Sequence, residues 1–112
     1  IACGNAHRNG TKVALLFIDL DEFKTVNDRY GHEAGDAVLR EVARRLRECI
    51  RAEDTAARIG GDEFLVILGN LPEAQTAATV AGNIGRALAR PIETPGQTVS
   101  SGASIGIALY PD

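Results

Sequence analysis

The apolar positions in the first half of the chain form two different patterns, an unbroken run and a helical repeat. Residues 13–18 (VALLFI) form an unbroken apolar run, which predicts a strand that is buried on both sides or packed under helices, and Asp19 follows at its end. Residues 34–50 repeat apolar side chains every three or four positions with Arg and Glu between them, which predicts an amphipathic helix.

The second half continues with short runs. Residues 55–59 and 64–68 are apolar and are separated only by residues 60–63, which predicts a hairpin with that tetrapeptide as its turn. Residues 72–90 have a helical period, begin with a proline that a first helical turn tolerates, and end before the next proline. Residues 101–110 alternate apolar with small residues, which is typical of a strand packed on one side.

The order strand, helix, strand, strand, helix, strand predicts an α+β fold, the ferredoxin-like βαββαβ arrangement with helices packed on an antiparallel sheet. The chain has 112 residues, 45% of them hydrophobic and 24% charged, so it has the size and composition of one domain over residues 1–112. This fold hosts many functions, and the function must therefore be inferred from a site.

Charge and cysteine content exclude several classes of function. The net charge of -3 and the pI near 5.3 argue against nucleic-acid binding, and a phosphorylated ligand would need a metal or a few placed basic residues. No apolar run approaches the length of about 20 residues that crosses a bilayer, so we expect no membrane contact by this segment; an anchor of the parent protein would lie outside it. Cys3 and Cys49 are far apart and form no CxxC pair, which favours a reducing cytoplasm over a zinc site or a disulfide framework.

Acidic residues are expected to gather at one edge of the sheet. The predicted fold makes the first strand and the hairpin neighbours, which brings Asp19 close to Asp62 and Glu63. Carboxylates in such a cluster repel one another unless a cation lies between them, and hard oxygen ligands suit Mg²⁺ or Mn²⁺. Gly60 and Gly61 can adopt positive φ and let a ligand lie against the backbone. In the alternative interpretation, Asp62 and Glu63 are solvated turn residues, and Gly60 and Gly61 merely close the hairpin.

Two motifs then carry a family resemblance. RIGGDEF (58–64), together with FIDLDEFKTVNDRYGHEAGD (17–36), closely resembles the GGDEF domain of diguanylate cyclases, and the match extends from Val13 to Tyr110. The resemblance implies a fold like that of nucleotidyl cyclases and polymerase palms. It also implies GTP as substrate and cyclic di-GMP as product, made with release of pyrophosphate when a second GGDEF domain faces the first in a homodimer.

The resemblance assigns catalytic roles residue by residue. Asp19, the backbone carbonyl of Leu20 and Asp62 correspond to ligands of two Mg²⁺ or Mn²⁺ ions per half-site, with Glu63 close by. Asp62 is also a candidate to accept the proton of the attacking ribose 3′-hydroxyl, with water as the alternative acceptor. Lys24 matches a position that stabilises charge on the phosphates; without the resemblance it reads as a surface lysine on a short helix.

Substrate selection is assigned to two further residues. Asn27 and Asp36 match the residues that read guanine, and Gly60 and Gly61 would leave room for GTP. A carboxylate at Asp36 can accept hydrogen bonds from N1 and N2 of guanine, whereas adenine presents an acceptor at N1. Taken alone, Asp36 is a solvated acid in the first part of a helix, where negative charge is favourable anyway.

A second site is implied by the segment RAED (51–54). Arg51 and Asp54 match the RxxD site at which cyclic di-GMP inhibits its own synthesis, and Arg can bind phosphate or a guanine edge in bidentate fashion. A helix end followed by a turn can show the same spacing without any function. We expect product bound at this site to hold the domains in an unproductive arrangement.

The match departs from the family at both ends of the chain. Residues 1–10 (IACGNAHRNG) differ from the segment that usually precedes the first strand, and the family continues past the last strand into a helix carrying a Lys and an Arg that hold phosphates. We therefore expect a domain truncated at both ends, from a longer protein. The rival function is a catalytically silent domain that senses GTP or cyclic di-GMP and regulates an attached EAL phosphodiesterase. A purely structural dimerisation module would not need the guanine-reading pair.

Overall fold

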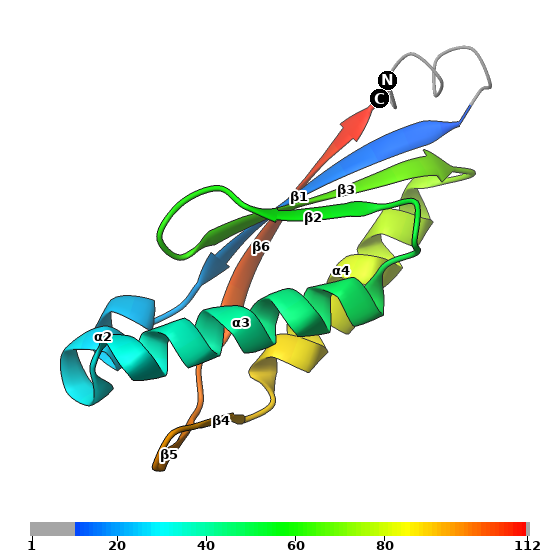
Figure 1. Cartoon of the computed structure of the whole chain (residues 1–112). Coiled ribbons are helices and arrows are strands. Elements are labelled where there is room, and N and C mark those ends of the chain that lie inside the picture. The colour runs from blue at the N-terminus through cyan, green and yellow to red at the C-terminus, as the bar shows by residue number, and fades with distance from the viewer. Residues whose placement is uncertain (1–10, 112) are drawn as a thin grey trace.

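The computed structural model describes residues 11–111 (Figure 1). Its helices are α2 (Phe23–Tyr30), α3 (His32–Cys49) and α4 (Ala74–Ala89). Its strands are β1 (Lys12–Leu20), β2 (Thr55–Arg58), β3 (Glu63–Leu71), β4 (Ile92–Thr94), β5 (Gln97–Val99) and β6 (Ala103–Tyr110). Residues 1–10, Cys3 among them, lie outside the described residues.

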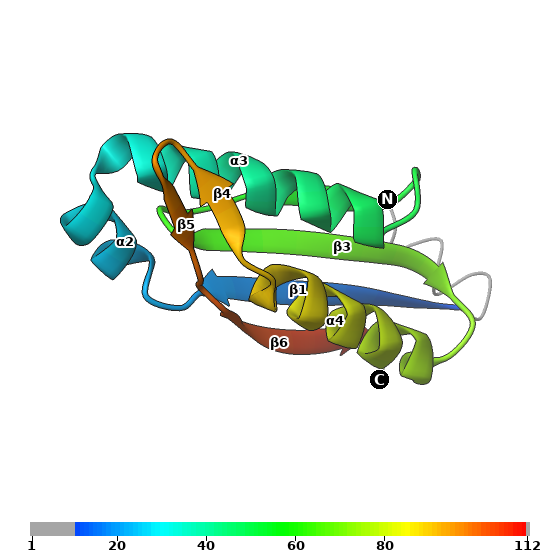
Figure 2. The same ribbon diagram turned by 90° about the horizontal axis from the view of Figure 1, so that it is seen from below.

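The main sheet has the strand order β2-β3-β1-β6, and every neighbouring pair is antiparallel. α3 and α4 lie on the same face of this sheet (Figure 2). Both features belong to the ferredoxin-like arrangement, so the predicted α+β fold is confirmed. Helix α3 lies in the connection between β1 and the edge strand β2. The chain then reverses direction in the hairpin, and β3 pairs with β1.

The core lies between the sheet and the two long helices. Alternate residues of β1 and β3 point into it, as the two-residue period of a strand requires. The apolar stripe of α3 packs against them, and Phe64, the aromatic residue of the GGDEF motif, is only 3% exposed. Among the buried side chains are Leu16, Ile18, Val38, Val42, Leu46, Phe64, Val66, Leu68, Ile84 and Leu88.

The opposite face of β1 is more open than its apolar run suggests. Phe17 is 47% exposed, and Leu15, Leu65 and Ile67 on the same face are only partly buried. Within residues 11–111 no helix packs over these side chains, because α3 and α4 both cover the other face. In the described part of the chain the strand is therefore packed under helices on one side, which is the second of the two expected arrangements, and it is not buried on both sides.

One helix and two short strands were not expected from the periodicity. Helix α2 is separate from α3 because Gly31, at φ 90°, turns the chain between them, so α3 begins at His32 and not at residue 34. Strands β4 and β5 form a small two-stranded sheet around Gly96, at φ 76°. In contrast, α4 starts at Ala74, two residues after the proline, and ends before Pro91 as predicted.

A buried arginine joins the two long helices. Arg45 of α3 is 7% exposed, and its guanidinium donates to the carbonyls of Ala87, Arg90 and Pro91 at 2.8 to 2.9 Å. These carbonyls lie at or just after the end of α4, where helices leave acceptors without partners. Glu41, one turn earlier, accepts from Nε of Arg45 at 2.8 Å and balances its charge. The arginine thus has a structural role.

Candidate active site

Two carboxylates lie side by side at the end of the sheet. Asp19 of β1 is directly opposite Glu63 of β3, and directly opposite residues of antiparallel strands place their side chains on the same face. The backbone N–H of Leu20 donates to the carbonyl of Asp62 at 2.9 Å, which ties the hairpin turn to the end of β1. The structure therefore places the Asp19 and Glu63 side chains side by side and ties the backbone of Asp62 to that of Leu20. Like charges that face each other destabilise a strand pair unless something positive lies nearby.

The turn that follows β2 is held by its own residues. The N–H groups of Ile59 and Gly60 both donate to the carbonyl of Glu63, at 2.9 and 3.4 Å. From β2, Nε of Arg58 donates to the carbonyls of Gly60 and Gly61, at 2.9 and 3.2 Å. These bonds fix the turn without any ligand.

The two glycines of the turn do not use positive φ, which corrects the expectation from the sequence. A Cβ at Gly60 would lie 2.7 Å from Oε1 of Glu63, so this glycine makes room for the Glu63 carboxylate. A Cβ at Gly61 would meet nothing within 4 Å. The open space in the turn is therefore beside Gly61, whereas Gly60 accommodates an acidic side chain.

The corner between β1 and α2 is tied to the start of β6. The N–H of Asp21 donates to the carbonyl of Gly102 at 2.9 Å, and the hydroxyl of Ser104 donates to Oδ1 of Asp21 at 2.9 Å. Ser101 donates its hydroxyl to the carbonyl of Asp21. Glu22 then adopts φ 59°, a conformation that is unfavourable for a residue with a side chain. The hydrogen bonds between Asp21 and the residues at the start of β6 hold this strained corner, and with it the end of β1, in place.

The residues assigned to GTP recognition lie on α2 and α3, at the same end of the molecule as the hairpin turn (Figure 1). Lys24 and Asn27 are three residues apart on α2 and therefore share one helix face. Lys24 and Asp36 are exposed, whereas Asn27 is partly buried against Gly35 of α3. The structure thus places Asn27 beside the residue that precedes Asp36.

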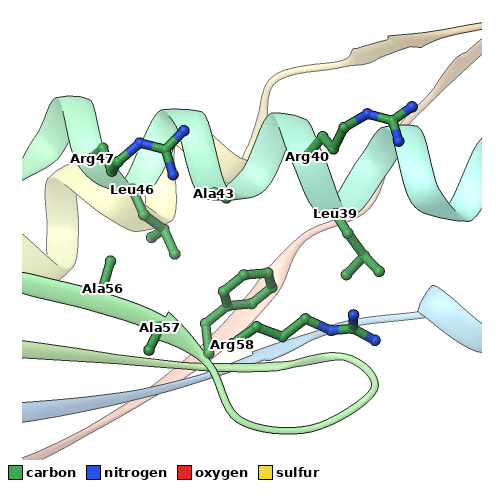
Figure 3. A pocket seen from close by; sticks show the side chains of 9 residues that line it. Leu39, Arg40, Ala43, Leu46, Arg47, Ala56, Ala57 and Arg58 are labelled. Carbon is green, nitrogen blue, oxygen red and sulfur yellow. The ribbon is translucent and has the colours of Figure 1, made fainter.

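A groove of about 290 Å³ separates α3 from the β2–β3 hairpin (Figure 3). Leu39 and Leu46 point from α3 toward the hairpin, and Phe64 is also among the residues that line the groove. The groove is lined by Leu39, Arg40, Ala43, Leu46, Arg47, Ala56, Ala57, Arg58 and Phe64. Its charged lining residues are all arginines, which gives an acidic chain a local attraction for anions.

The RxxD residues lie at the opposite end of β2 from the GGDE turn. Arg51 and Asp54 come directly before this strand, and four residues of strand span about 13 Å. Both oxygens of Asp54 accept hydrogen bonds from Arg51, and the N–H of Gly69 donates to Oδ1 at 3.2 Å. The two predicted residues are together, and they bind each other.

The donor set suits a hard divalent cation. Asp19, Glu63 and Asp62 offer carboxylate oxygens and Leu20 a carbonyl, all of the type that Mg²⁺ and Mn²⁺ prefer. Within residues 11–111 no three His, Cys, Asp or Glu side chains already converge on one point. Mg²⁺ characteristically keeps waters and shares itself with substrate phosphates, so one or two carboxylates at an open edge fit that chemistry.

Arg58 and Gly35 contribute to the site but were not singled out from the sequence. Arg58 lies two residues before Gly60 in a chain of negative net charge, and a basic residue at that place was a signal for a local partner of the turn. Gly35 interrupts a helical period, and an interior helical glycine without a reason for its presence is unfavourable. Neither signal says which neighbour the residue contacts.

Comparison with known proteins gives a consistent result over the whole chain. The family described as "Diguanylate cyclase, GGDEF domain" matches residues 1–112. Diguanylate cyclase TpbB of Pseudomonas aeruginosa is 49% identical over 109 residues, which are 96% of this chain and 25% of TpbB. Cyclic di-GMP phosphodiesterase NbdA of the same organism is 38% identical over 108 residues, 96% of this chain and 14% of NbdA. The chain spans only 14% to 26% of the first curated relatives.

Solved structures agree with the fold. The structure of TpbB that comprises only the GGDEF domain has a TM-score of 0.94 and 47% identity, covering 98% of this chain and 64% of that one. The GGDEF domain of DgcB from Caulobacter crescentus, solved in complex with c-di-GMP, has a TM-score of 0.85 and 32% identity, covering 96% and 65%. In residues 11–111, no helix combines the length and apolar character that crossing a membrane requires.

Proposed function

This chain belongs to the GGDEF domain family of diguanylate cyclases, and from that membership we propose that it forms one half of a cyclase site. It binds one GTP and faces a second copy of the domain, and the two copies together convert two GTP into cyclic di-GMP. One juxtaposition of residues carries this function: the facing acids Asp19 and Glu63 lie at the same end of the molecule as Asn27 and Asp36. The substrate implies the cytoplasm as the compartment.

We assign metal binding to residues at the end of the sheet. Asp19, Asp62 and the carbonyl of Leu20 would hold two Mg²⁺ or Mn²⁺ ions, with Glu63 beside them. When bound, such ions lower the pKa of a coordinated hydroxyl and neutralise charge that develops on the phosphates. The tie between Leu20 and Asp62 keeps the two sides of this site together before any ion arrives.

The reaction joins the ribose of one GTP to the α-phosphate of the other. The 3′-oxygen forms a bond to the α-phosphorus while the bond to the β-phosphate bridging oxygen breaks, so pyrophosphate leaves. The hydroxyl proton passes to the carboxylate of Asp62 or to water. Lys24, exposed on α2, neutralises phosphate charge, and the same step repeated from the facing domain closes the ring.

Guanine is selected by hydrogen bonding. Asp36 accepts from N1 and N2 of the base, and adenine, which has an acceptor at N1, leaves that carboxylate unpaired. The groove beside Leu39 begins one helical turn after Asp36 and ends at Arg58, which holds the turn with Gly61. Along α3 the groove extends to Arg47, and its arginines, Arg40, Arg47 and Arg58, supply positive charge.

A sensor domain is the second candidate, favoured by the resemblance to the phosphodiesterase NbdA. In that case the chain binds GTP or cyclic di-GMP without turnover and regulates an attached enzyme. The acids of the turn are intact, and a silent domain does not require them.

The deciding experiment incubates the complete protein with Mg²⁺ and GTP and follows cyclic di-GMP by chromatography. Asp62→Ala should abolish product, while Asp28→Ala, which removes an exposed acid from α2, should not. Absence of product from a folded dimer that still binds GTP or cyclic di-GMP would contradict the cyclase and support the sensor.

A further inference from the structure

Gly35 leaves a gap that the side chain of Asn27 fills. A Cβ built on Gly35 would lie 1.9 Å from Oδ1 and 2.9 Å from Cγ of Asn27. Unbonded heavy atoms do not approach so closely, so no side chain at position 35 is compatible with this placement of Asn27. The third nearest atom, Cζ of Phe23 at 3.4 Å, is in ordinary contact. The conflict is therefore with the Asn27 carboxamide alone.

The backbone around this contact is fixed by the turn between α2 and α3. Gly31, at φ 90°, donates its N–H to the carbonyl of Asn27 at 2.9 Å, and Gly35 donates to the carbonyl of Gly31 at 3.2 Å. One chain of backbone bonds thus sets Asn27 and Gly35 against each other. The carboxamide is the movable group, so a larger residue at position 35 would displace it while the helices stay in place.

The other described helical glycines have no such neighbour. At Gly82 of α4 a Cβ would first meet the mobile end of Arg86, at 3.6 Å, and at Gly85 it would first meet Ile105 at 3.9 Å. Both sites have room for alanine. Gly35 differs because the atom it accommodates belongs to a residue assigned to guanine recognition, and because Asp36 follows it directly.

We propose that Gly35 is a positioning residue for substrate selection: its missing side chain forms a slot that holds the Asn27 carboxamide beside Asp36. The base-reading pair is then set before GTP arrives, and binding does not have to order it. This inference rests on the proposed function, because it assumes that Asn27 contacts guanine.

The test compares Gly35→Ala, Asn27→Ala and their double variant with the matched control Gly82→Ala in the complete protein. Affinity is measured by calorimetry with a non-hydrolysable GTP analogue and Mg²⁺, and KM and kcat by cyclic di-GMP formation. Gly35→Ala should weaken binding and raise KM on the order of ten-fold, the size of one lost hydrogen bond, with little change in kcat. Gly82→Ala should change neither quantity.

The double variant separates positioning from a general loss of structure. Once Asn27 is alanine there is nothing for the new Cβ to displace, so adding Gly35→Ala should cause no further loss of affinity, and any stability lost in Gly35→Ala should return. Equal GTP binding by Gly35→Ala and the unsubstituted protein, or additive losses in the double variant, would overturn this inference alone. Failure of the unsubstituted protein to bind GTP at all would overturn the proposed function as well.

Discussion

Arg51 and Asp54 are joined by a two-point ion pair, with Nε to Oδ2 at 3.1 Å and Nη2 to Oδ1 at 3.0 Å. Asp54 also accepts the backbone N–H groups of Arg51 and Gly69, and its side chain is only 2% exposed, against 43% for Arg51. Burial raises the pKa of Asp54, but these hydrogen bonds outweigh it and hold the pKa below its usual value. Groups of Arg51 and Gly69 already donate hydrogen bonds to the Asp54 carboxylate, whereas the Arg51 guanidinium is the more exposed member of the pair.

Product inhibition should therefore depend on Arg51. In an active parent protein we expect Arg51→Ala to raise the inhibition constant for cyclic di-GMP at least about ten-fold, since charge-assisted contacts to phosphate or guanine contribute about 1.5–3 kcal/mol. Initial rates at increasing cyclic di-GMP measure it. Arg86→Ala, an exposed arginine of α4, is the control, and an unchanged constant in Arg51→Ala would refute the inhibitory site.

Metal dependence should depend on Asp19. Asp19→Asn keeps the size of the side chain but removes its charge, and we expect a loss of activity of at least about a hundred-fold that excess Mg²⁺ or Mn²⁺ restores only in part. Titration of cyclic di-GMP formation with each ion gives the result. Asp28→Asn makes the same change in net charge at an exposed position of α2, so equal losses in both variants would argue against a metal at Asp19.

Stability should depend on Arg45 far more than on its neighbour Arg44. Arg45→Leu removes the side-chain donor from three carbonyls at the end of α4 and just after it, and it leaves Glu41 without one partner, so we expect it to lower the free energy of unfolding by about 3 kcal/mol. Arg44→Leu removes an arginine that is half exposed and should have a much smaller effect. Urea denaturation of the two variants distinguishes them, and equal losses would contradict the structural role of Arg45.

Acid should weaken the fold through Glu41. Hydrogen bonds from Arg44 and then Arg45 lower its pKa from 4.5 to about 2, so the folded state favours the charged carboxylate. Its contribution is complete above pH 4.5 and is lost as the pH falls toward 2. The free energy of unfolding should fall between about pH 5 and about pH 2, and fall less in Glu41→Gln. Identical pH profiles of the two proteins would show that another group is responsible.

The elements that depend on local pattern were predicted well. The long helix, the hairpin with its turn and the first and last strands each have enough residues to reveal their period. Helix α2 has eight residues and mostly polar ones, and β4 and β5 have three each, too few for a period to appear. The bounds of α3 changed because a single backbone angle at Gly31 decides where α2 ends.

Site residues were predictable as types, and their contacts were not. The neighbouring positions of Asp19 and Glu63 followed from strand order and were confirmed by the register. The freedom of Gly60 was interpreted as positive φ, whereas the structure uses it to admit the Glu63 carboxylate, and that depends on one side chain's direction. The pairing of Arg51 with Asp54 and the slot at Gly35 likewise arise between groups whose distance only the folded chain sets.

The sheet order gives the two ends of the site different local stability. β1 is hydrogen-bonded on both sides, by β3 and β6, whereas β2 has only β3 beside it. Opening β2 therefore breaks one ladder of bonds, and opening β1 breaks two. Amide hydrogens of β1, behind Asp19, should exchange with solvent slowly, and those of β2, between Arg51 and the GGDE turn, more rapidly. A ligand at the RxxD residues would thus meet an edge strand, whereas the proposed metal site at Asp19 is supported by a central strand.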